Sequence, residues 1–270
     1  MIGLVGGLAA VAALVAVWAL VLQPRPTHSG GPTQSAVAGA STPASVAPSA
    51  APSGAPGASS GPSIAPGGKV AEALVAALHV DPFVAHVEEA ILASTITNGR
   101  RLTITANAVG DVSGPDVAIR TTGTGNGPAT DEQIVTIGDV AWIRPTKATA
   151  WEVHPRSLVA PSLEGLLSTI QPLDDPQVLV DMGVEDLDGV KVHHLTAVGA
   201  VAYHSLNGID GLYDTFDIWA TDTGIPVLMK ATFSEVQDVN SITGSTEIRY
   251  SKVGGPITIT APAGAPSLAP

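Results

Sequence analysis

Residues 216 to 229 read Phe-Asp-Ile-Trp-Ala-Thr-Asp-Thr-Gly-Ile-Pro-Val-Leu-Met, and further alternating runs occupy 248 to 253 and 256 to 262. Apolar and polar side chains alternate along these runs, and successive side chains of a strand point to opposite faces of a sheet. The stretch therefore predicts a strand, a tight turn at Asp222-Thr223-Gly224, a long return strand and two more strands that end at Pro262. Such a half-buried antiparallel sheet hides one of its faces.

Two hairpins upstream show the same pattern. Residues 134 to 143 form two apolar runs separated by Gly138-Asp139. Residues 184 to 195 turn through Asp188-Gly189, a dipeptide typical of a type I′ turn. Alternation over 102 to 108 predicts one further strand.

Helical spacing is expected in four places. Apolar residues recur every four positions over 70 to 78 and over 83 to 91, where the second run follows Asp81-Pro82 and ends before Asn98-Gly99. Residues 162 to 170 and 176 to 183 are predicted to form two short helices between the hairpins. For both longer stripes, core packing and the lining of a ligand cleft are the two interpretations.

The order of these elements defines a fold class. Helices, strands, two short helices and closing strands follow one another without the alternation of βαβ units, which favours an α+β fold. Its sheet should be antiparallel, with the helices gathered on one face. Residues 69 to 262 are long enough for one such domain with its own core.

The closing motifs carry a resemblance to a known family. The order strand, Asp-Thr-Gly-x-Pro, strand, gap, strand, Gly-x-Pro-x-Thr-Ile-x-x-Pro resembles the end of the LolA-like envelope carriers, in particular the LppX/LprG-type lipoproteins. Residues 137 to 144 with 151 to 153, and residues 184 to 195, are similar to that family's tryptophan-containing element and central hairpin. The resemblance implies a strongly curved antiparallel sheet, an unfinished β-barrel, with helices packed in its concave face.

In that family's fold, an apolar cavity between sheet and helices receives acyl chains. The hydrophobic residues expected to line the corresponding ligand cavity here are Trp142, Leu166, Leu167, Ile170, Phe216 and Ile218. Ordinary core packing is the alternative role for each of them. Because aromatic residues make up only 4% of the chain, aliphatic walls that suit acyl chains are expected.

The segment before the domain predicts a membrane location. Residues 2 to 22 contain no charged side chain and supply about 20 apolar positions, the length of a membrane-spanning helix. Residues 1 to 22 are therefore expected to be a transmembrane anchor, with a cleaved signal segment as the alternative. The chain has no cysteine, so it departs from the family's lipoproteins, which carry a lipid-modified one.

Low-complexity segments flank the domain. Residues 23 to 68 consist almost entirely of Ala, Pro, Ser and Gly, and too little apolar surface exists there to offset the entropy of ordering the chain. They are expected to be a disordered linker, and residues 263 to 270 a disordered tail. The expected arrangement is a single pass through the cell membrane, with the folded domain on the periplasmic or cell-wall side.

Charge excludes one class of partner. Between Glu72 and Lys252 there are 24 acidic residues and 10 Lys or Arg, a formal net charge of −14. No basic stripe is available for phosphate backbones, so no nucleic-acid partner is expected.

Catalytic and metal motifs are also missing from the folded part. It contains no Gly-x-Ser-x-Gly elbow and no cysteine nucleophile, so we expect no enzyme activity. His193 and His194 are adjacent on a predicted strand and should point to opposite faces, so they cannot share a metal there. We expect no cofactor and no metal site.

Two functions remain. The first is a membrane-tethered domain that binds a lipid or acyl-chain ligand for presentation or transfer in the bacterial cell envelope. The second is an envelope sensor or interaction domain that uses the same curved sheet to bind a protein partner.

Overall fold

A computed structural model describes residues 67–97, 99–125, 128–159, 167, 169–199, 201–204, 210–237 and 240–267. The predicted membrane segment, residues 1–22, lies outside the described residues, as does most of the predicted linker. Within the described part of the chain, no helix is long and apolar enough to cross a membrane.

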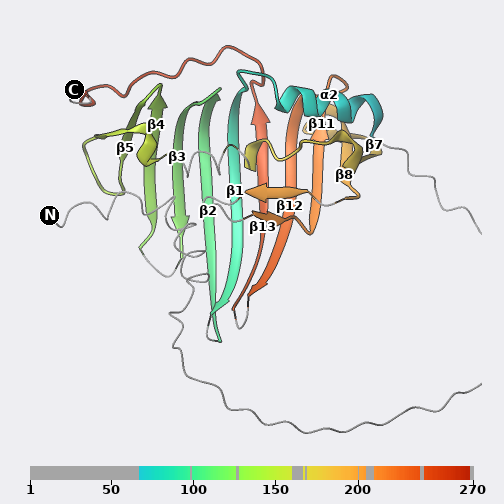
Figure 1. The fold of residues 1–270 in the computed structure, drawn as a ribbon, viewed down its shortest axis with the longest axis horizontal. Coiled ribbons are helices and arrows are strands. Elements are labelled where there is room, and N and C mark those ends of the chain that lie inside the picture. Colours follow the sequence, from blue (N-terminus) through green and yellow to red (C-terminus); the bar gives the residue numbers. More distant parts are fainter. Residues whose placement is uncertain are drawn as a thin grey trace, which may run out of the picture. The chain divides into compact units, whose positions relative to one another are not determined.

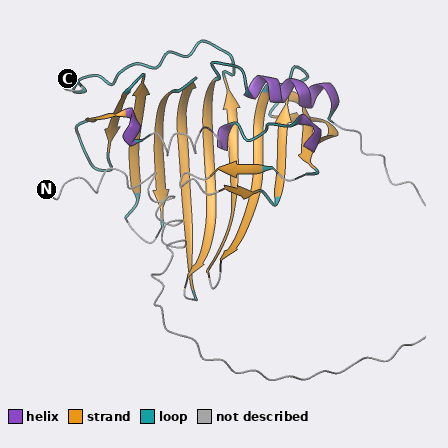
Figure 2. Ribbon diagram, viewed as in Figure 1, coloured by secondary structure: helices purple, strands orange, loops and turns teal. Residues whose placement is uncertain are grey.

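Most of the described chain forms one antiparallel sheet of eleven strands (Figures 1 and 2). The sheet is open and curved, and its order is β6-β5-β4-β3-β2-β1-β13-β12-β11-β8-β7. Its strands are β1 (Val84–Thr97), β2 (Arg100–Ser113), β3 (Asp116–Thr124), β4 (Thr130–Ile137), β5 (Val140–Arg144), β6 (Glu152–Pro155), β7 (Leu179–Leu187), β8 (Val190–Ala197), β11 (Thr215–Ala220), β12 (Pro226–Gln237) and β13 (Asn240–Ser251).

Few other elements accompany the sheet in the described residues. A helix, α2 (Gly68–Leu78), contacts β7 and β12 at one end of the sheet (Figure 1). The described residues also form two 3-10 turns, η1 (Arg156–Leu158) and η2 (Pro176–Val178), and a two-stranded ribbon of β9 (Ala202–His204) and β10 (Asp210–Leu212). The predicted antiparallel sheet, curved and open, is confirmed.

The predicted hairpins are confirmed as well. β4 and β5 pair across Gly138, whose φ of +56° is left-handed. β7 and β8 pair across Asp188 and Gly189, which have φ of +54° and +84°. Positive φ at both central residues is the requirement of a type I′ turn, and Asp-Gly meets it.

The closing hairpin also forms as predicted. β11 pairs with β12, and the turn between them is held by hydrogen bonds from Gly224 N to Thr221 O and from Thr221 N to Ile225 O. Gly224 has φ of +78°, and a Cβ there would collide with the backbone of Ala73 and Leu74 in α2. The turn therefore needs glycine for its conformation and for the close approach of the helix.

The second predicted helix, residues 83 to 91, is wrong, because this segment belongs to β1. Residues four apart share a face in a strand as well as in a helix, so the spacing of Phe83, Val87 and Ile91 fits both structures. The structure buries alternate residues of β1, including Ala85 and the polar Glu89. Those small and polar residues at inward positions concealed the two-residue period.

Residues 176 to 183 do not form the short helix predicted for them. Asp175 accepts a hydrogen bond from Gln177 N and starts the 3-10 turn η2, after which β7 begins at Leu179. Gly183, expected to end a helix, instead lies where the pairing of β7 with β8 shifts register. The proline and glycine that suggested helix ends mark a turn and a bulge here.

The last predicted strand, residues 256 to 262, is also wrong. Both neighbours of β13 are already strands of the sheet, β1 and β12, so the chain after Ser251 has no free edge to join. It turns at Lys252 and Gly254, both with positive φ, and runs as an extended segment toward β4 and β5 (Figure 1). Trp142 Nε1 donates a hydrogen bond to Pro266 O at 2.8 Å and holds this segment.

Candidate functional site on the inner face of the sheet

One face of the sheet, here called the inner face, carries most of the buried side chains. It includes Val87, Ile119, Ile143, Ile218 and Met229, each at most 6% exposed. Register pairing joins them across the strands, because directly paired residues lie on the same face of a sheet. α2 lies over the β7 to β12 end of this face, where Leu74 and Leu78 are fully buried in the same core cluster as Ile218 and Met229.

Four of the six residues predicted to line a cavity are brought together at that end. Ile170, Phe216 and Ile218 are 0 to 2% exposed and belong to the core cluster, and Leu167 is half-buried against it. Tyr250 donates its hydroxyl hydrogen bond to Ile170 O at 2.8 Å, which ties the 167–170 region to β13. In the structure these side chains are buried in the core cluster.

The other two predicted residues do not join them. Leu166 lies outside the described residues. Trp142 is half-buried on β5 between the buried Ala141 and Ile143, so its side chain points to the opposite face, here called the outer face. There its indole holds the C-terminal segment.

A single row of paired residues crosses eight strands of the inner face. From β8 to β4 the row, here called the central row, contains Leu195, Ile218, Met229, Ile248, Glu89, Ala108, Thr121 and Glu132. Its first four members are aliphatic and fully buried. Its last four contain two carboxylic acids, a hydroxyl and a methyl group, and we call them the polar half.

Glu89 is the first acidic residue of the polar half. It is 6% exposed and accepts a hydrogen bond from Thr246 Oγ1 at 3.1 Å. Burial raises the pKa of Glu89 from its ordinary value of 4.5 to about 7, and the hydrogen bond from Thr246 opposes this shift. The side chain therefore changes charge close to neutral pH.

Further polar groups on this face are buried. Glu132, at the other end of the polar half, is 2% exposed. The hydroxyl of Thr121 and that of Thr95, a 3% exposed residue farther along β1, have no hydrogen-bond partner among the described residues. A buried polar group without a partner costs about 1 to 3 kcal/mol, so such groups in a native fold call for an explanation.

Sequence reasoning missed the polar half. Glu89 was assigned to a helix, Thr121 to a flexible loop over residues 121 to 128, and no strand was predicted at Glu132, whereas the structure has them in β1, β3 and β4. The available clue was the strand parity of Val87, Glu89 and Ile91, which puts an acid between two apolar side chains.

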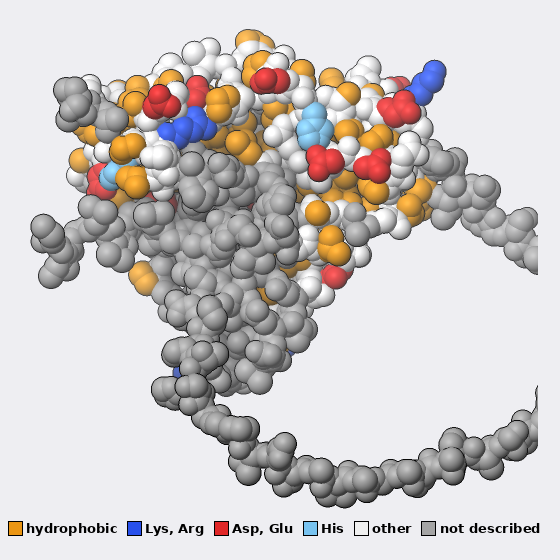
Figure 3. Space-filling model, viewed as in Figure 1, with side chains coloured by type: hydrophobic (Ala, Val, Ile, Leu, Met, Phe, Trp, Pro, Cys, Tyr) orange, Lys and Arg blue, Asp and Glu red, His pale blue; other side chains and the backbone are white. Residues whose placement is uncertain are grey.

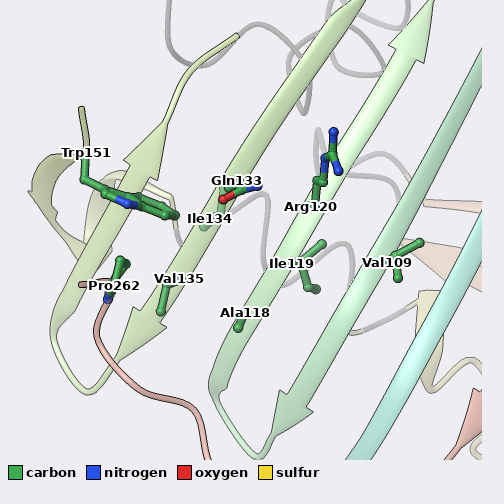
Figure 4. Close-up of a pocket in the computed structure, with 9 residues that line it drawn as sticks. All are labelled: Val109, Ala118, Ile119, Arg120, Gln133, Ile134, Val135, Trp151 and Pro262. Carbon is green, nitrogen blue, oxygen red and sulfur yellow. The ribbon is translucent and has the colours of Figure 1, made fainter. Parts of the chain in front are cut away.

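The outer face has a groove of about 320 Å³ beside the C-terminal segment (Figure 4). Its volume is at the lower end of the range for small-molecule pockets. Arg120 at this groove is engaged by both carboxylate oxygens of Asp131. Its lining residues are Val109, Ala118, Ile119, Arg120, Gln133, Ile134, Val135, Trp151 and Pro262.

The two adjacent histidines of β8 contact different carboxylates. His193 lies 2.7 Å from Asp181 and 3.0 Å from Asp222. The hydrogen bond with Asp181 is the main reason that the pKa of His193 is raised. His194 stacks on Trp219 with ring centroids 4.4 Å apart. No group of three or more potential ligands in the described residues is arranged to hold a metal ion.

The charge distribution gives no indication of a nucleic-acid surface. Acidic side chains are scattered over the described part of the face in view in Figure 3, and basic side chains form no continuous stripe. Several basic residues, such as Arg120, Arg156 and Lys230, are engaged in ion pairs with carboxylates.

Comparison with known proteins gives structural neighbours only. No family model and no curated protein matches the chain. Similar solved structures include a DUF1329 family protein from Desulfovibrio piger, with 17% identity over 70% of this chain and 92% of that one. They also include a LolA superfamily protein from Nitrosomonas europaea, with 10% identity, and an outer membrane lipoprotein-sorting protein domain from Vibrio parahaemolyticus, with 11% identity.

The last two matches each cover 68% of this chain and 90% of the other. LolA superfamily members are thus among the structural neighbours, as the sequence resemblance predicts. All three TM-scores are 0.24, so these likenesses establish no ligand, partner or site for this chain.

Proposed function

We propose that the chain binds the acyl chains of a lipid on the inner face of its sheet. The observation that carries this proposal is the width of the apolar inner face, which continues across β1 to β5, beyond the strands that α2 contacts. The apolar side chains on that part of the face are Val87, Ala93, Ile104, Val112, Val117, Ile119, Ile134, Ala141 and Ile143.

Aliphatic side chains on an open sheet favour a flexible apolar ligand. Transfer of each methylene group from water to such a surface contributes about 0.8 kcal/mol, so a long acyl chain gains most of its affinity from contact alone. The sheet ends at β6 and β7 and does not close into a barrel, so in this proposal the ligand enters without the opening of a closed barrel.

The cellular role that fits is lipid presentation or transfer from a membrane-tethered position outside the cytoplasm, without catalysis. Residues 2 to 22 supply the anchor in this proposal, and the Ala, Pro, Ser and Gly linker supplies the reach.

A paired substitution tests the ligand site. Ala106 on β2 shares the inner face with Ala108, whereas its neighbour Asn107 is exposed on the outer face. Full-length wild type and the variants Ala106→Trp and Asn107→Trp are purified from a bacterial host in mild detergent. Native mass spectrometry and lipid extraction then measure the bound lipid.

We expect one lipid per chain in wild type and Asn107→Trp, and a large loss in Ala106→Trp, because an indole occupies the space of the acyl chains. Equal lipid content in both variants, with both folded by circular dichroism, would place the ligand elsewhere. Absence of lipid from wild type after incubation with mixed envelope lipids would refute the proposal.

A second function is favoured by one observation at the sheet edge. Met182, Val184 and Val190 on the β7–β8 hairpin are 45 to 56% exposed, and β7 is an edge strand. Exposed apolar side chains beside unpaired backbone groups are typical of strands that bind a partner protein. A pull-down with Met182→Asp and Val184→Asp tests this alternative, because the charges would abolish such binding and leave lipid content unchanged.

A further inference from the structure

The two edges of the sheet differ in how well they are protected against pairing with another strand. β6 has four residues and ends at Pro155, which has no N–H to offer a neighbour. β7 has nine residues, and among the described residues no strand pairs with its free side (Figure 1). Residues 182 to 186 of this strand are all exposed. β7 is therefore the edge that is suited to accept a strand.

The β7–β8 turn fixes which backbone groups point to the free side. Residues that flank a two-residue turn hydrogen-bond each other, and bonded and non-bonded pairs then alternate along the hairpin. The pair that flanks Asp188-Gly189 is Leu187 and Val190. Counting back along β7, Val184 and Asp186 direct their N–H and C=O groups away from β8. These groups are ready to bond to a further strand.

The acidic side chains at this edge already have contacts within the chain. Asp186 lies directly opposite Lys191 on β8, where unlike charges stabilise the pairing. Glu185 accepts a hydrogen bond from Trp219 Nε1 at 2.9 Å, and its other carboxylate oxygen lies 3.0 Å from His194 Nδ1. A partner strand therefore does not have to be basic to balance these two acids.

A second copy of β7 fits this edge in an antiparallel register centred on Val184. A two-fold axis there brings Val184 opposite Val184 of the second copy, and their outward N–H and C=O groups bond reciprocally. Glu185 then faces Gly183, and Asp186 faces Met182, so no acid lies opposite an acid. The paired run is short, residues 182 to 186, because β7 shifts register before Gly183.

The neighbouring registers bring like charges together. An axis at Glu185 or at Asp186 would place two identical carboxylates directly opposite each other. An axis at Gly183 would place Asp181 opposite Glu185 of the second copy. Like charges directly opposite each other destabilise strand pairing, so the register centred on Val184 is the favoured one.

We propose that β7 pairs with β7 of a second copy of this chain, antiparallel and centred on Val184, and so joins two sheets edge to edge. This inference rests on the second function proposed above, since it names the partner that the β7 edge binds. Because directly paired residues lie on the same face of a sheet, the inner faces of the two copies continue into each other.

Single cysteines test the pairing, since the chain has no cysteine of its own. Val184→Cys is compared with Met182→Cys, a matched control because both side chains lie on β7 and are 56% exposed. Full-length variants in mild detergent are oxidised with copper phenanthroline. Non-reducing electrophoresis then measures the disulfide-linked dimer, and circular dichroism confirms that each variant is folded.

We expect the dimer yield of Val184→Cys to exceed that of Met182→Cys by about tenfold. In the proposed register the two Val184 Cα atoms lie about 5.5 Å apart, which a disulfide spans, whereas the two Met182 residues are displaced by four positions, about 14 Å along the strands. Differently tagged Met182→Cys and Asp186→Cys chains, when mixed, should cross-link to each other more than either does to itself. This second measurement tests the same register without a change at Val184.

The outcomes separate this inference from the function on which it rests. Equal dimer yields from Val184→Cys and Met182→Cys would overturn the pairing of two copies, as would a mixture that shows no preference for the mixed dimer. If the pairing fails in this way while Met182→Asp and Val184→Asp still abolish the binding of another protein, the second function stands with a different partner. Failure of both tests would refute the second function itself.

Discussion

The two halves of the central row lie on one face of one sheet and differ sharply in chemistry. Under α2 the row consists of Leu195, Ile218, Met229 and Ile248, all 0% exposed. Over β1 to β4 it consists of Glu89, Ala108, Thr121 and Glu132. The first half has the composition of a core, and the second keeps polar groups that a core would replace with aliphatic ones. In the proposed function, the difference separates the part of the face that stabilises the fold from the part that faces the ligand.

The largest expected effect is in the apolar half. Ile218→Ala should lower the free energy of unfolding by about 2 to 5 kcal/mol, because it removes a fully buried side chain and leaves a cavity. Urea denaturation measures this change, and lipid content should stay at the wild-type level. Loss of lipid with unchanged stability would mean that the apolar half binds the ligand and does not stabilise the fold.

In the polar half, the effect depends on pH. Burial raises the pKa of Glu89 from 4.5 to about 7, so between these values the folded protein holds a proton that the unfolded chain releases. The contribution of Glu89 therefore makes the free energy of unfolding fall as pH rises through this window, by up to about 3 kcal/mol.

Glu89→Gln should remove this fall and make the variant more stable than wild type at pH 8. Denaturation at pH 4.5, 6 and 8 measures the slope, with Glu88→Gln as the control that keeps it. An unchanged slope in Glu89→Gln would mean that this carboxyl is not buried as described.

The contact between α2 and the closing turn gives a smaller effect. Gly224→Ala should lower the free energy of unfolding by about 2 kcal/mol, because it combines a left-handed backbone with a collision against Ala73 and Leu74. At Gly254, which has φ of +68° and nothing within 4 Å of an added Cβ, alanine should cost only about 1 kcal/mol. Equal thermal shifts in the two variants would argue against close packing of the helix on the turn.

His193 lies on β8, the last strand of the apolar half, and its raised pKa also makes the free energy of unfolding depend on pH. Asp181 raises the pKa of His193, so the stabilisation is fully present below the unfolded pKa of about 6.5 and is lost as pH rises through the folded value. His193→Gln should therefore destabilise at pH 5.5 by about 1 kcal/mol and have little effect at pH 8.

The smallest expected effect is on the outer face. Trp142→Phe removes the hydrogen bond to Pro266 and should lower the free energy of unfolding by no more than about 1 kcal/mol. Faster proteolysis of residues 256 to 267 should accompany it, with lipid content unchanged. Loss of lipid in this variant would indicate that Trp142 contacts the ligand, as the sequence predicted.

Prediction from sequence succeeded where local chemistry decides the backbone. The dipeptides Asp188-Gly189 and Gly138-Asp139 predicted their hairpins correctly, because few residues adopt positive φ without strain. It failed over 83 to 91, where four-residue spacing fits both a helix and a strand, and over 256 to 262, where alternation cannot show whether a sheet edge is free.

For the site, local pattern identified apolar residues that the structure buries. Ile170, Phe216 and Ile218 were chosen for their hydrophobicity, and all three belong to the core cluster. Glu89, Thr121 and Glu132 come together only through pairing between strands distant in sequence. No short-range pattern contains that register.

The sequence by itself determined the alternating strands, the glycine turns and the acidic charge, because these follow from the pleat, from backbone sterics and from composition. The tertiary structure alone decided which residues share the central row, since register is fixed by long-range pairing and by the face that must be buried. It also decided that α2 covers one half of that row, because the close approach at Gly224 positions the helix there.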